Sequence, residues 1–165
     1  MMMKTSRIYS FIITVIIMVT VFINAALSDN KNTKIPRFVS TKTNEINMRT
    51  GPNIKYPIKW IFTKKDEPLE IVDKFDQWYY VRDITGDFGW IHSSVLSQKR
   101  TVIINSNKIQ NLYKSSNYES RIIAYLEPKI RCELKKCTAL MCKLHCKNYI
   151  GWVDRKILWG VYDHE

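Results

Sequence analysis

The residues of this 165-residue chain that could bind a metal, form disulfides or act in catalysis include four cysteines and three histidines. Cys132, Cys137, Cys142 and Cys146 follow the spacing C-x4-C-x4-C-x3-C. Together with His145 they could bind zinc as thiolates, whereas in an oxidising compartment they would form disulfides. The spacing matches no common two-knuckle zinc pattern and contains no Cys-x-x-Cys redox pair. We therefore expect disulfides and no bound metal, with a small zinc-binding module as the alternative.

The residues around the cysteines predict how they pair. Four cysteines allow three pairings. The sequence on either side of residues 139 and 140 is typical of two strands joined by a turn, which places Cys137 opposite Cys142. Cys132 then lies opposite Cys146 to within one residue, an offset that a β-bulge would absorb. We expect the nested disulfides Cys137–Cys142 and Cys132–Cys146.

Other combinations that could support catalysis are sparse. No histidine lies in a hydrolase or metalloprotease motif, and the chain has only His92, His145 and His164. Acid pairs such as Asp66 and Glu67 fall in lysine-rich turns, where acidic side chains are usually solvent-exposed and have no catalytic role. Cys142 and His145 are three residues apart, so on a strand they point to opposite faces. The sequence therefore predicts a protein that is not an enzyme.

Short β-rich runs must position these residues. Hydrophobic residues make up 45% of the chain and aromatic residues 12%, enough to bury a core. From Arg37 onward there is no long helical stripe, and the runs that recur are Lys59–Phe62, Leu69–Val72, Trp78–Ile84, Gly89–His92 and Thr101–Ile104. Gly86 between two aromatic runs is typical of a tight hairpin. The fold class predicted is all-β.

The amino terminus is typical of an export signal. Lys4 and Arg7 precede an apolar run from Ile8 to Ile23, and the small residues Ala25, Ala26 and Ser28 follow. An uncleaved membrane anchor is the alternative, because Ile8 to Leu27 is long enough to span a bilayer. In both cases the rest of the chain is expected to be exported, in the periplasm or cell envelope. A membrane would be contacted only through this segment, if it is uncleaved.

The chain is strongly basic, with a formal net charge of +11. Such a charge favours anionic partners in general. The lysines are scattered among asparagine and isoleucine rather than clustered, and an exported protein seldom meets nucleic acid. We therefore expect no nucleic-acid partner.

Two halves of the chain carry related motifs. Asn47–Asn53 aligns with Asn111–Asn117 at an offset of 64 residues, and Phe88–Ile91 aligns with Ile150–Val153 at an offset of 62. A nearly constant offset is typical of a duplicated unit with altered loops. Because the connection Ser97–Arg100 is very short, we expect the two units to pack directly against each other.

The motifs of the first half resemble the bacterial SH3-like domain. They are Asn47–Pro52 near the start, Trp78–Val81 in the middle and Gly89–Ile91 before the close. In the second half, Cys137-x4-Cys142 and the ending Ile157–Tyr162 resemble the C-terminal unit of small exported proteins with two such domains. The resemblance implies two small β-barrels in tandem, no cofactor and a role in binding or targeting at the cell envelope.

The predicted organisation has four parts. A signal peptide or anchor helix occupies residues 1–25, and a linker covers residues 26–36. The first SH3-like domain spans residues 37–98, and a diverged, cysteine-rich second domain spans residues 101–163.

Large aromatic residues divide into a predicted core set and a predicted binding set. A unit this small needs most of its rings for its core, since each large ring contributes about 150–250 Å² of buried or contact area. The core set is Trp78, Tyr80, Trp90 and Trp152. Rings beside turns or on alternate strand positions can face solvent, and a guanidinium can hold a carboxylate. The binding set is Arg49, Tyr56, Trp60 and Tyr79.

The sequence thus predicts a noncatalytic exported protein that binds an envelope component through the first unit. The resemblance names peptidoglycan or an envelope protein as ligand. An envelope assembly or structural factor that binds a protein partner is the second hypothesis.

Overall fold

A computed structural model describes residues 34–165, and Ile35–Glu165 form one compact unit. The predicted signal or anchor and residues 26–33 of the predicted linker lie outside the described residues. Within the described part, the regular structure is β-strand with two short 3₁₀ turns, so the all-β prediction is confirmed. No helix in this part is long and apolar enough to cross a membrane.

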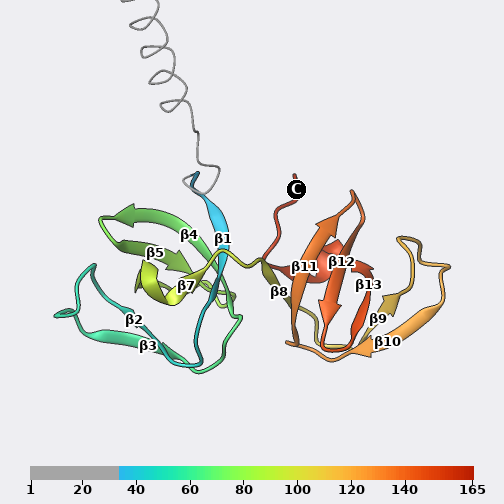
Figure 1. Ribbon diagram of the computed structural model, residues 1–165, viewed down its shortest axis with the longest axis horizontal. Helices are drawn as coiled ribbons and strands as arrows, with labels where there is room; N and C mark the ends of the chain where they lie inside the picture. The colour runs from blue at the N-terminus through green and yellow to red at the C-terminus, as the bar shows by residue number, and fades with distance from the viewer. Residues whose placement is uncertain (1–33) are drawn as a thin grey trace, which may run out of the picture. The chain divides into compact units, whose positions relative to one another are not determined.

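The first half forms a seven-stranded antiparallel sheet (Figure 1). Its strand order is β3-β2-β6-β5-β4-β1-β7, and a 3₁₀ turn, Ser93–Val95, precedes β7. The strands are β1 (Arg37–Thr41), β2 (Ile46–Arg49), β3 (Ile58–Phe62), β4 (Pro68–Phe75), β5 (Trp78–Arg82), β6 (Phe88–His92) and β7 (Leu96–Ser97). Gly86 has a φ of 90° in the turn between β5 and β6, as predicted for that hairpin.

The second half repeats this sheet strand for strand. Its order is β10-β9-β13-β12-β11-β8-β14, and a 3₁₀ turn, Arg155–Ile157, precedes β14. The strands are β8 (Thr101–Ile104), β9 (Gln110–Tyr113), β10 (Ile122–Leu126), β11 (Arg131–Cys137), β12 (Met141–Cys146), β13 (Tyr149–Asp154) and β14 (Leu158–Trp159). The matching order supports the duplication inferred from the sequence, while the predicted domain boundaries remain predictions.

Small irregularities repeat as well. The β4–β5 pairing shifts between Ile71 and Asp73, and the β11–β12 pairing shifts at the equivalent place, between Leu134 and Lys136. The turns before β4 and β11 each contain a residue with a φ of 62°, which is Asp66 in the first half and Lys129 in the second. Shared bulges and turns of this kind fix the register of each sheet.

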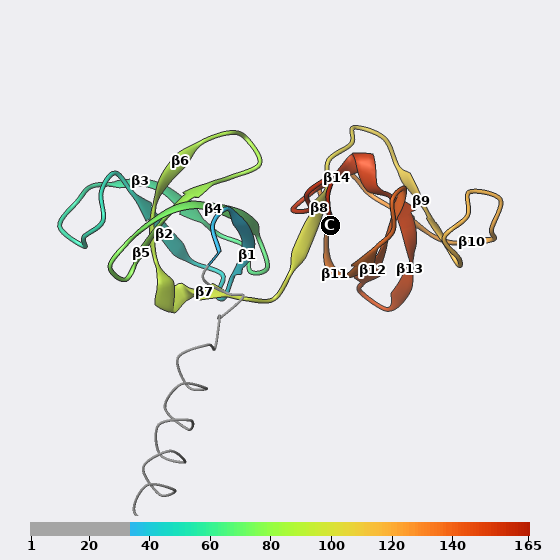
Figure 2. The same cartoon turned by 90° about the horizontal axis from the view of Figure 1, so that it is seen from above.

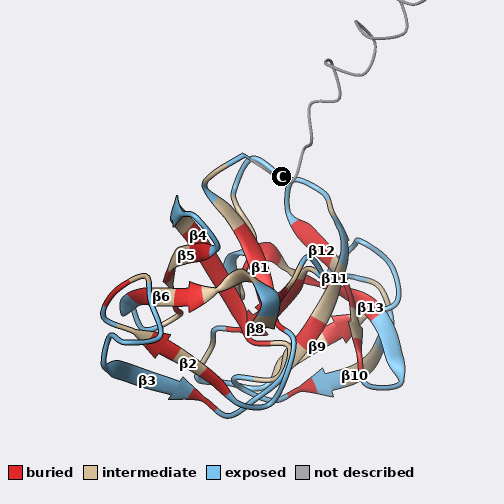
Figure 3. Ribbon diagram, turned by 60° about the vertical axis from the view of Figure 1, so that its left-hand side comes forward, coloured by how far each residue is buried: buried red, intermediate tan, exposed pale blue. Residues whose placement is uncertain are grey.

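Each sheet encloses its own apolar core. The first is built on Met48, Leu69, Ile71, Val81 and Ile91, and the second is built on Val102, Ile104, Leu112, Cys142 and Leu144. Figure 3 shows the buried residues in red along β1, β4 and β8, whereas β3 is largely exposed. Trp78 and Trp152 are buried, but neither belongs to a core cluster, and Tyr80 and Trp90 are only half-buried.

A glycine lets two strands approach closely in each core. A Cβ added to Gly89 would lie 2.4 Å from Met48 Cγ, and one added to Gly151 would lie 2.6 Å from the Tyr113 carbonyl oxygen. Neither position has room for the methyl group of an alanine. In both halves the residue after the glycine is the tryptophan that pairs with the neighbouring strand, β2 or β9.

We expect Gly89→Ala and Gly151→Ala each to lower the free energy of unfolding by about 1–3 kcal/mol, because the added methyl group overpacks a filled core. Gly151 should be the more sensitive, since its nearest neighbour is backbone. Gly86→Asn is the control, because nothing lies within 4 Å of an added Cβ there and asparagine tolerates positive φ. Urea unfolding measures the change, and unaltered midpoints for both alanine variants would contradict the packing account.

The cysteines form the two predicted disulfides, Cys132–Cys146 and Cys137–Cys142, and no cysteine is free. The expected one-residue bulge is present in β11. Because all four sulfurs are oxidised, no thiolate is left for the alternative zinc site.

Removal of a disulfide should lower stability more when the loop that it closes is longer. The sequence separations are 14 and 5 residues. In the chain-entropy approximation, C132S/C146S should cost about 3 kcal/mol and C137S/C142S about 2 kcal/mol. Urea unfolding of the oxidised protein and both variants tests this order, and a larger loss for C137S/C142S would contradict it.

The two sheets contact each other through aromatic and charged residues near the connection from β7 to β8, and Figure 2 shows the path of that connection. The ring of buried Phe38 lies 5.4 Å from that of Trp159 and 4.7 Å from that of Tyr162. Glu70, also buried, accepts a hydrogen bond of 2.9 Å from the Tyr162 hydroxyl and pairs with Arg82 at 2.6 Å. Burial and this hydrogen bond raise the pKa of Tyr162. The two units therefore pack directly, as the short connection predicted.

Candidate functional site

Cross-strand pairing gathers aromatic and basic side chains on one face of the first sheet. Tyr80 on β5 pairs with Trp90 on β6, which pairs with Arg49 on β2. Residues directly opposite in antiparallel strands point to the same side of a sheet. The core residues occupy the alternate positions, so this row lies on the side away from the core. A second row on that side joins Phe75, Trp78 and His92.

We call this surface the outer face and define it by Arg49, Phe75, Trp78, Tyr80, Phe88, Trp90 and His92. Tyr80 is its centre, with its ring 5.0 Å from that of Trp90 and 5.7 Å from that of Phe88. The Phe88 pair is stacked, with an interplanar angle of 26°. Contacts of this kind stabilise a protein by about 0.5–1.5 kcal/mol beyond area burial. They also hold the rings in fixed positions.

The two ends of the outer face are open to solvent. Phe75 is 61% exposed and Phe88 is 38% exposed, whereas Trp78 is covered and lies edge-on to His92 at 5.2 Å. Beside Phe75 lies a shallow hollow of about 510 Å³, whose other walls are Pro52, Asn53, Lys55 and Tyr56 of the β2–β3 loop. An open hollow next to exposed rings can accept a sugar ring or an extended peptide.

Arg49 holds the loop that forms this hollow. Its guanidinium donates a hydrogen bond of 2.8 Å to the carbonyl oxygen of Tyr56. The Tyr56 ring lies against Gly51, where an added Cβ would come within 2.6 Å of the ring. A guanidinium has five N–H donors, so Arg49 can hold the loop and still offer N–H groups to a carboxylate.

The predicted binding set is only partly brought together. Arg49 belongs to the outer face, and Tyr56 lines the hollow beside it. Trp60 is 55% exposed but lies on the edge strand β3, beside a separate hollow of about 220 Å³ that Ile61 and Arg131 also line. Tyr79 packs against the first core, with the Arg37 guanidinium 5.5 Å from its ring.

The predictions for Tyr79 and Tyr80 are therefore reversed: Tyr79 faces the core and Tyr80 faces outward. The sequence placed Tyr79 in the binding set and Tyr80 in the core, but Tyr79 pairs with buried Ile91 and Tyr80 pairs with half-buried Trp90. Strand alternation forces neighbours to opposite sides, so fixing Trp90 outward fixes Tyr80 outward as well. For the same reason Trp90 belongs to the outer face rather than to the core.

Sequence reasoning missed Phe75, Phe88 and His92. Phe88 and His92 could have been found from the register of the hairpin around Gly86, because that register pairs Arg82 with Phe88 and Trp78 with His92. Phe75 follows because it pairs with Trp78 across the preceding hairpin.

On the equivalent face of the second sheet the tryptophan is covered. Trp152 pairs with Tyr113 and Lys143, at the positions of Arg49 and Tyr80, and is only 8% exposed. The Lys136 ammonium group lies 5.4 Å from its ring centre. The lysine covers Trp152, and the exposed ring on this face, Tyr118, stands edge-on to Tyr113 at 6.0 Å, so the stacked row of the first sheet is the better candidate site.

Residues 34–165 contain no group of three or more histidine, cysteine or acidic side chains arranged to hold a metal ion. His92 of the outer face accepts a hydrogen bond from the backbone N–H of Ser94 and begins the 3₁₀ turn. Its role in the structure is thus local capping.

Residues 42–98 match the bacterial SH3 domain family, and this stretch is a bacterial SH3 domain. No curated protein matches the chain. Among solved structures, NlpC2 from Trichomonas vaginalis shares 16% identity and a TM-score of 0.35, covering 75% of this chain and 48% of that one. NlpC1 from the same organism has the same identity and score, covering 81% and 49%. The chain spans about half the length of each.

Loss of the Arg49 side chain should loosen the β2–β3 loop. We expect Arg49→Ala to speed amide hydrogen exchange in residues 50–57 and to cost about 1 kcal/mol of stability, because one hydrogen bond is lost. Lys55→Ala in the same loop is the control, since no hydrogen bond or ion pair forms from its amino group within the described residues. Equal exchange rates in wild type and Arg49→Ala would show that Arg49 does not hold the loop.

Proposed function

We propose that the chain is a noncatalytic exported binding protein with two SH3-like barrels, and that the first barrel recognises peptidoglycan through its outer face. The observation that carries the proposal is the fixed row of Tyr80, Trp90 and Phe88 next to the hollow formed by the β2–β3 loop. The bacterial SH3 domain match at residues 42–98 supports a binding role, since such domains are generally noncatalytic.

The chemistry of the outer face fits a polymer of sugars and peptides. Aromatic rings present flat apolar surfaces on which the faces of sugar rings can stack. Arg49 offers N–H groups to a carboxylate, and Lys55 adds positive charge at the hollow. Peptidoglycan presents both groups, because its glycan carries peptides with free carboxylates. The positive net charge of the chain favours association with such a polymer.

Export is supported by the cysteines as well as by the N-terminal sequence. Disulfides persist in oxidising compartments and are rare in the cytosol. Both disulfides lie in buried or half-buried strand positions of the second sheet, which fits a stabilising role. We therefore propose a location in the periplasm or cell envelope.

A protein ligand is the second candidate. The exposed rings of Phe75 and Phe88 would also bury apolar side chains of a partner. This would make the protein an envelope assembly factor rather than a wall-binding one.

Cosedimentation with purified peptidoglycan sacculi tests the proposal on the oxidised mature protein. We expect salt-resistant retention that weakens about tenfold, or about 1.4 kcal/mol, in the Tyr56→Ala/Phe75→Ala variant. Both residues are largely exposed, so the variant should stay folded.

Tyr125→Ala/Tyr149→Ala is the matched control, because it removes two exposed rings from the second sheet. It should bind like wild type. If wild-type protein is not retained on sacculi, the peptidoglycan proposal fails and a protein partner becomes the better account. Equal losses in both variants would remove the outer face as the site.

A further inference from the structure

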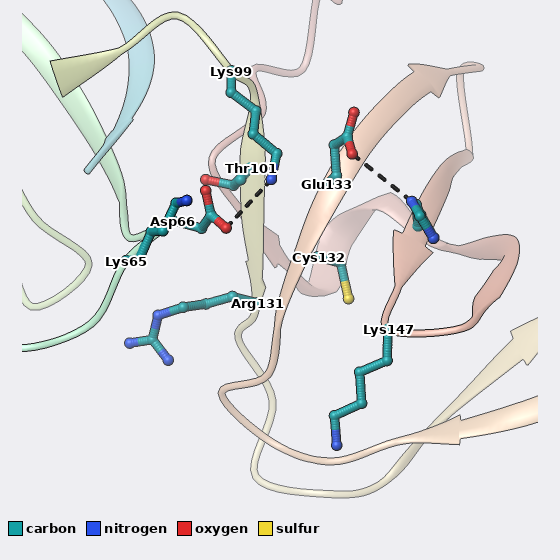
Figure 4. A pocket seen from close by; sticks show the side chains of 9 residues that line it. Lys65, Asp66, Lys99, Thr101, Arg131, Cys132, Glu133 and Lys147 are labelled. Atoms are coloured by element: carbon teal, nitrogen blue, oxygen red, sulfur yellow. Dashed lines mark hydrogen bonds and ion pairs between the residues drawn. The ribbon is translucent and has the colours of Figure 1, made fainter. Parts of the chain in front are cut away.

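A polar hollow at the junction of the two sheets is separate from the outer face. Its volume is about 280 Å³, and residues of both halves line it. Figure 4 shows Lys65, Asp66 and Lys99 on one side, Glu133 and Cys132 on the other, and Lys147 below. Arg131 also lines the hollow, so four basic side chains face two acidic ones.

The acidic residues at the hollow already have basic partners. Asp66 pairs with Lys99 at 3.3 Å. Glu133 pairs with Lys135 at 2.5 Å and lies 3.8 Å from His145.

Two ammonium groups remain after this pairing. Arg131 is neutralised by buried Glu67. Lys65 and Lys147 have no carboxylate partner among the residues that the structure describes. Lys65 comes from the turn before β4 and Lys147 from the turn between β12 and β13, so the two charges belong to different sheets.

Two further observations mark this place as one that favours negative charge. The hydrogen bond from Lys135, helped by the charges of Lys99 and His145, lowers the pKa of Glu133. On the floor, the hydroxyl of Thr101 is buried and has no hydrogen-bond partner among the described residues. A site with surplus positive charge and an unused hydroxyl suits an oxyanion.

We propose that this hollow binds a polyvalent oxyanion, held between the ammonium groups of Lys65 and Lys147. Lysine acts as a compact point charge with rotatable donors, so the site selects for charge more than for shape. A phosphoryl group and a cluster of carboxylates both have the required chemistry. Bound there, the anion would bridge the two sheets.

NMR titration of the oxidised, ¹⁵N-labelled mature protein at low ionic strength tests the site, because salt screens exposed charges. Pyrophosphate is the phosphoryl probe and citrate is the carboxylate probe. We expect the largest amide shifts around Lys65, Thr101 and Lys147, and binding about tenfold weaker in Lys65→Ala/Lys147→Ala. Shifts with pyrophosphate alone would identify phosphoryl groups as the ligand class, and similar shifts with both probes would identify charge alone.

Lys74→Ala/Lys108→Ala is the matched control, because it removes the same net charge from two exposed positions without ion pairs in the described part of the chain. It should bind both probes like wild type. Equal weakening in the control, shifts spread over the whole surface, or no saturable shift with either probe would overturn the proposal. Retention on sacculi is measured separately on Lys65→Ala/Lys147→Ala, so failure of this site and failure of the outer face are distinguishable.

Discussion

The close approach of two strands at a glycine is the constraint on which both halves of this protein depend. At Gly89 the missing side chain gives Met48 room to fill the first core, and at Gly151 it gives Leu112 room to fill the second. The strands can then pair at the next residue, a tryptophan in both cases. Because neighbours on a strand point to opposite sides, that tryptophan is directed away from the core.

This constraint explains why the two halves keep one framework and differ on their surfaces. In the first half, the outward Trp90 has Tyr80 and Arg49 as neighbours and stays partly open. In the second half, the outward Trp152 has lysines as neighbours and is covered. One sheet therefore presents a partly open tryptophan in a stacked row of rings, and its copy covers the equivalent tryptophan.

The disulfides fit the same comparison. Cys137 and Cys142 form the second cross-strand pair after the β11 bulge. The second pair after the equivalent shift in β4 is Lys74 and Tyr79. Tyr79 packs on the first core, so the crosslink stands where the first half uses a ring. Since a crosslink destabilises the unfolded chain, it offsets contact area that the second copy lacks.

Much of the fold could be predicted because its signals are local. Turn residues, short β-rich runs and the repeated Gly-Trp pair indicate the strands, and the cysteine spacing around one turn indicates both disulfides. The strands β1, β2, β9 and β10 were missed because each is only four or five residues long. Buried and half-buried residues do alternate in β2, but four residues are too few for the alternation to stand out. Tyr79 and Tyr80 were exchanged because aromatic residues are equally apolar on both sides of a strand, and only the pairing with Trp90 fixes the direction.

The candidate site was harder to predict, since it depends on register across three strands. Arg49 and Trp90 are far apart in sequence but adjacent in the sheet. The junction hollow is harder still, because Lys65 and Lys147 line the same hollow only after the two sheets pack. Nothing in the sequence around either lysine distinguishes it from the many others.

The central claim is that ligand recognition belongs to the outer face of the first sheet. Chemical-shift mapping of the oxidised mature protein with soluble peptidoglycan fragments tests it most directly. The account predicts saturable shifts in β5, β6 and the β2–β3 loop, with little change in β12 and β13. Shifts centred on the second sheet would contradict it.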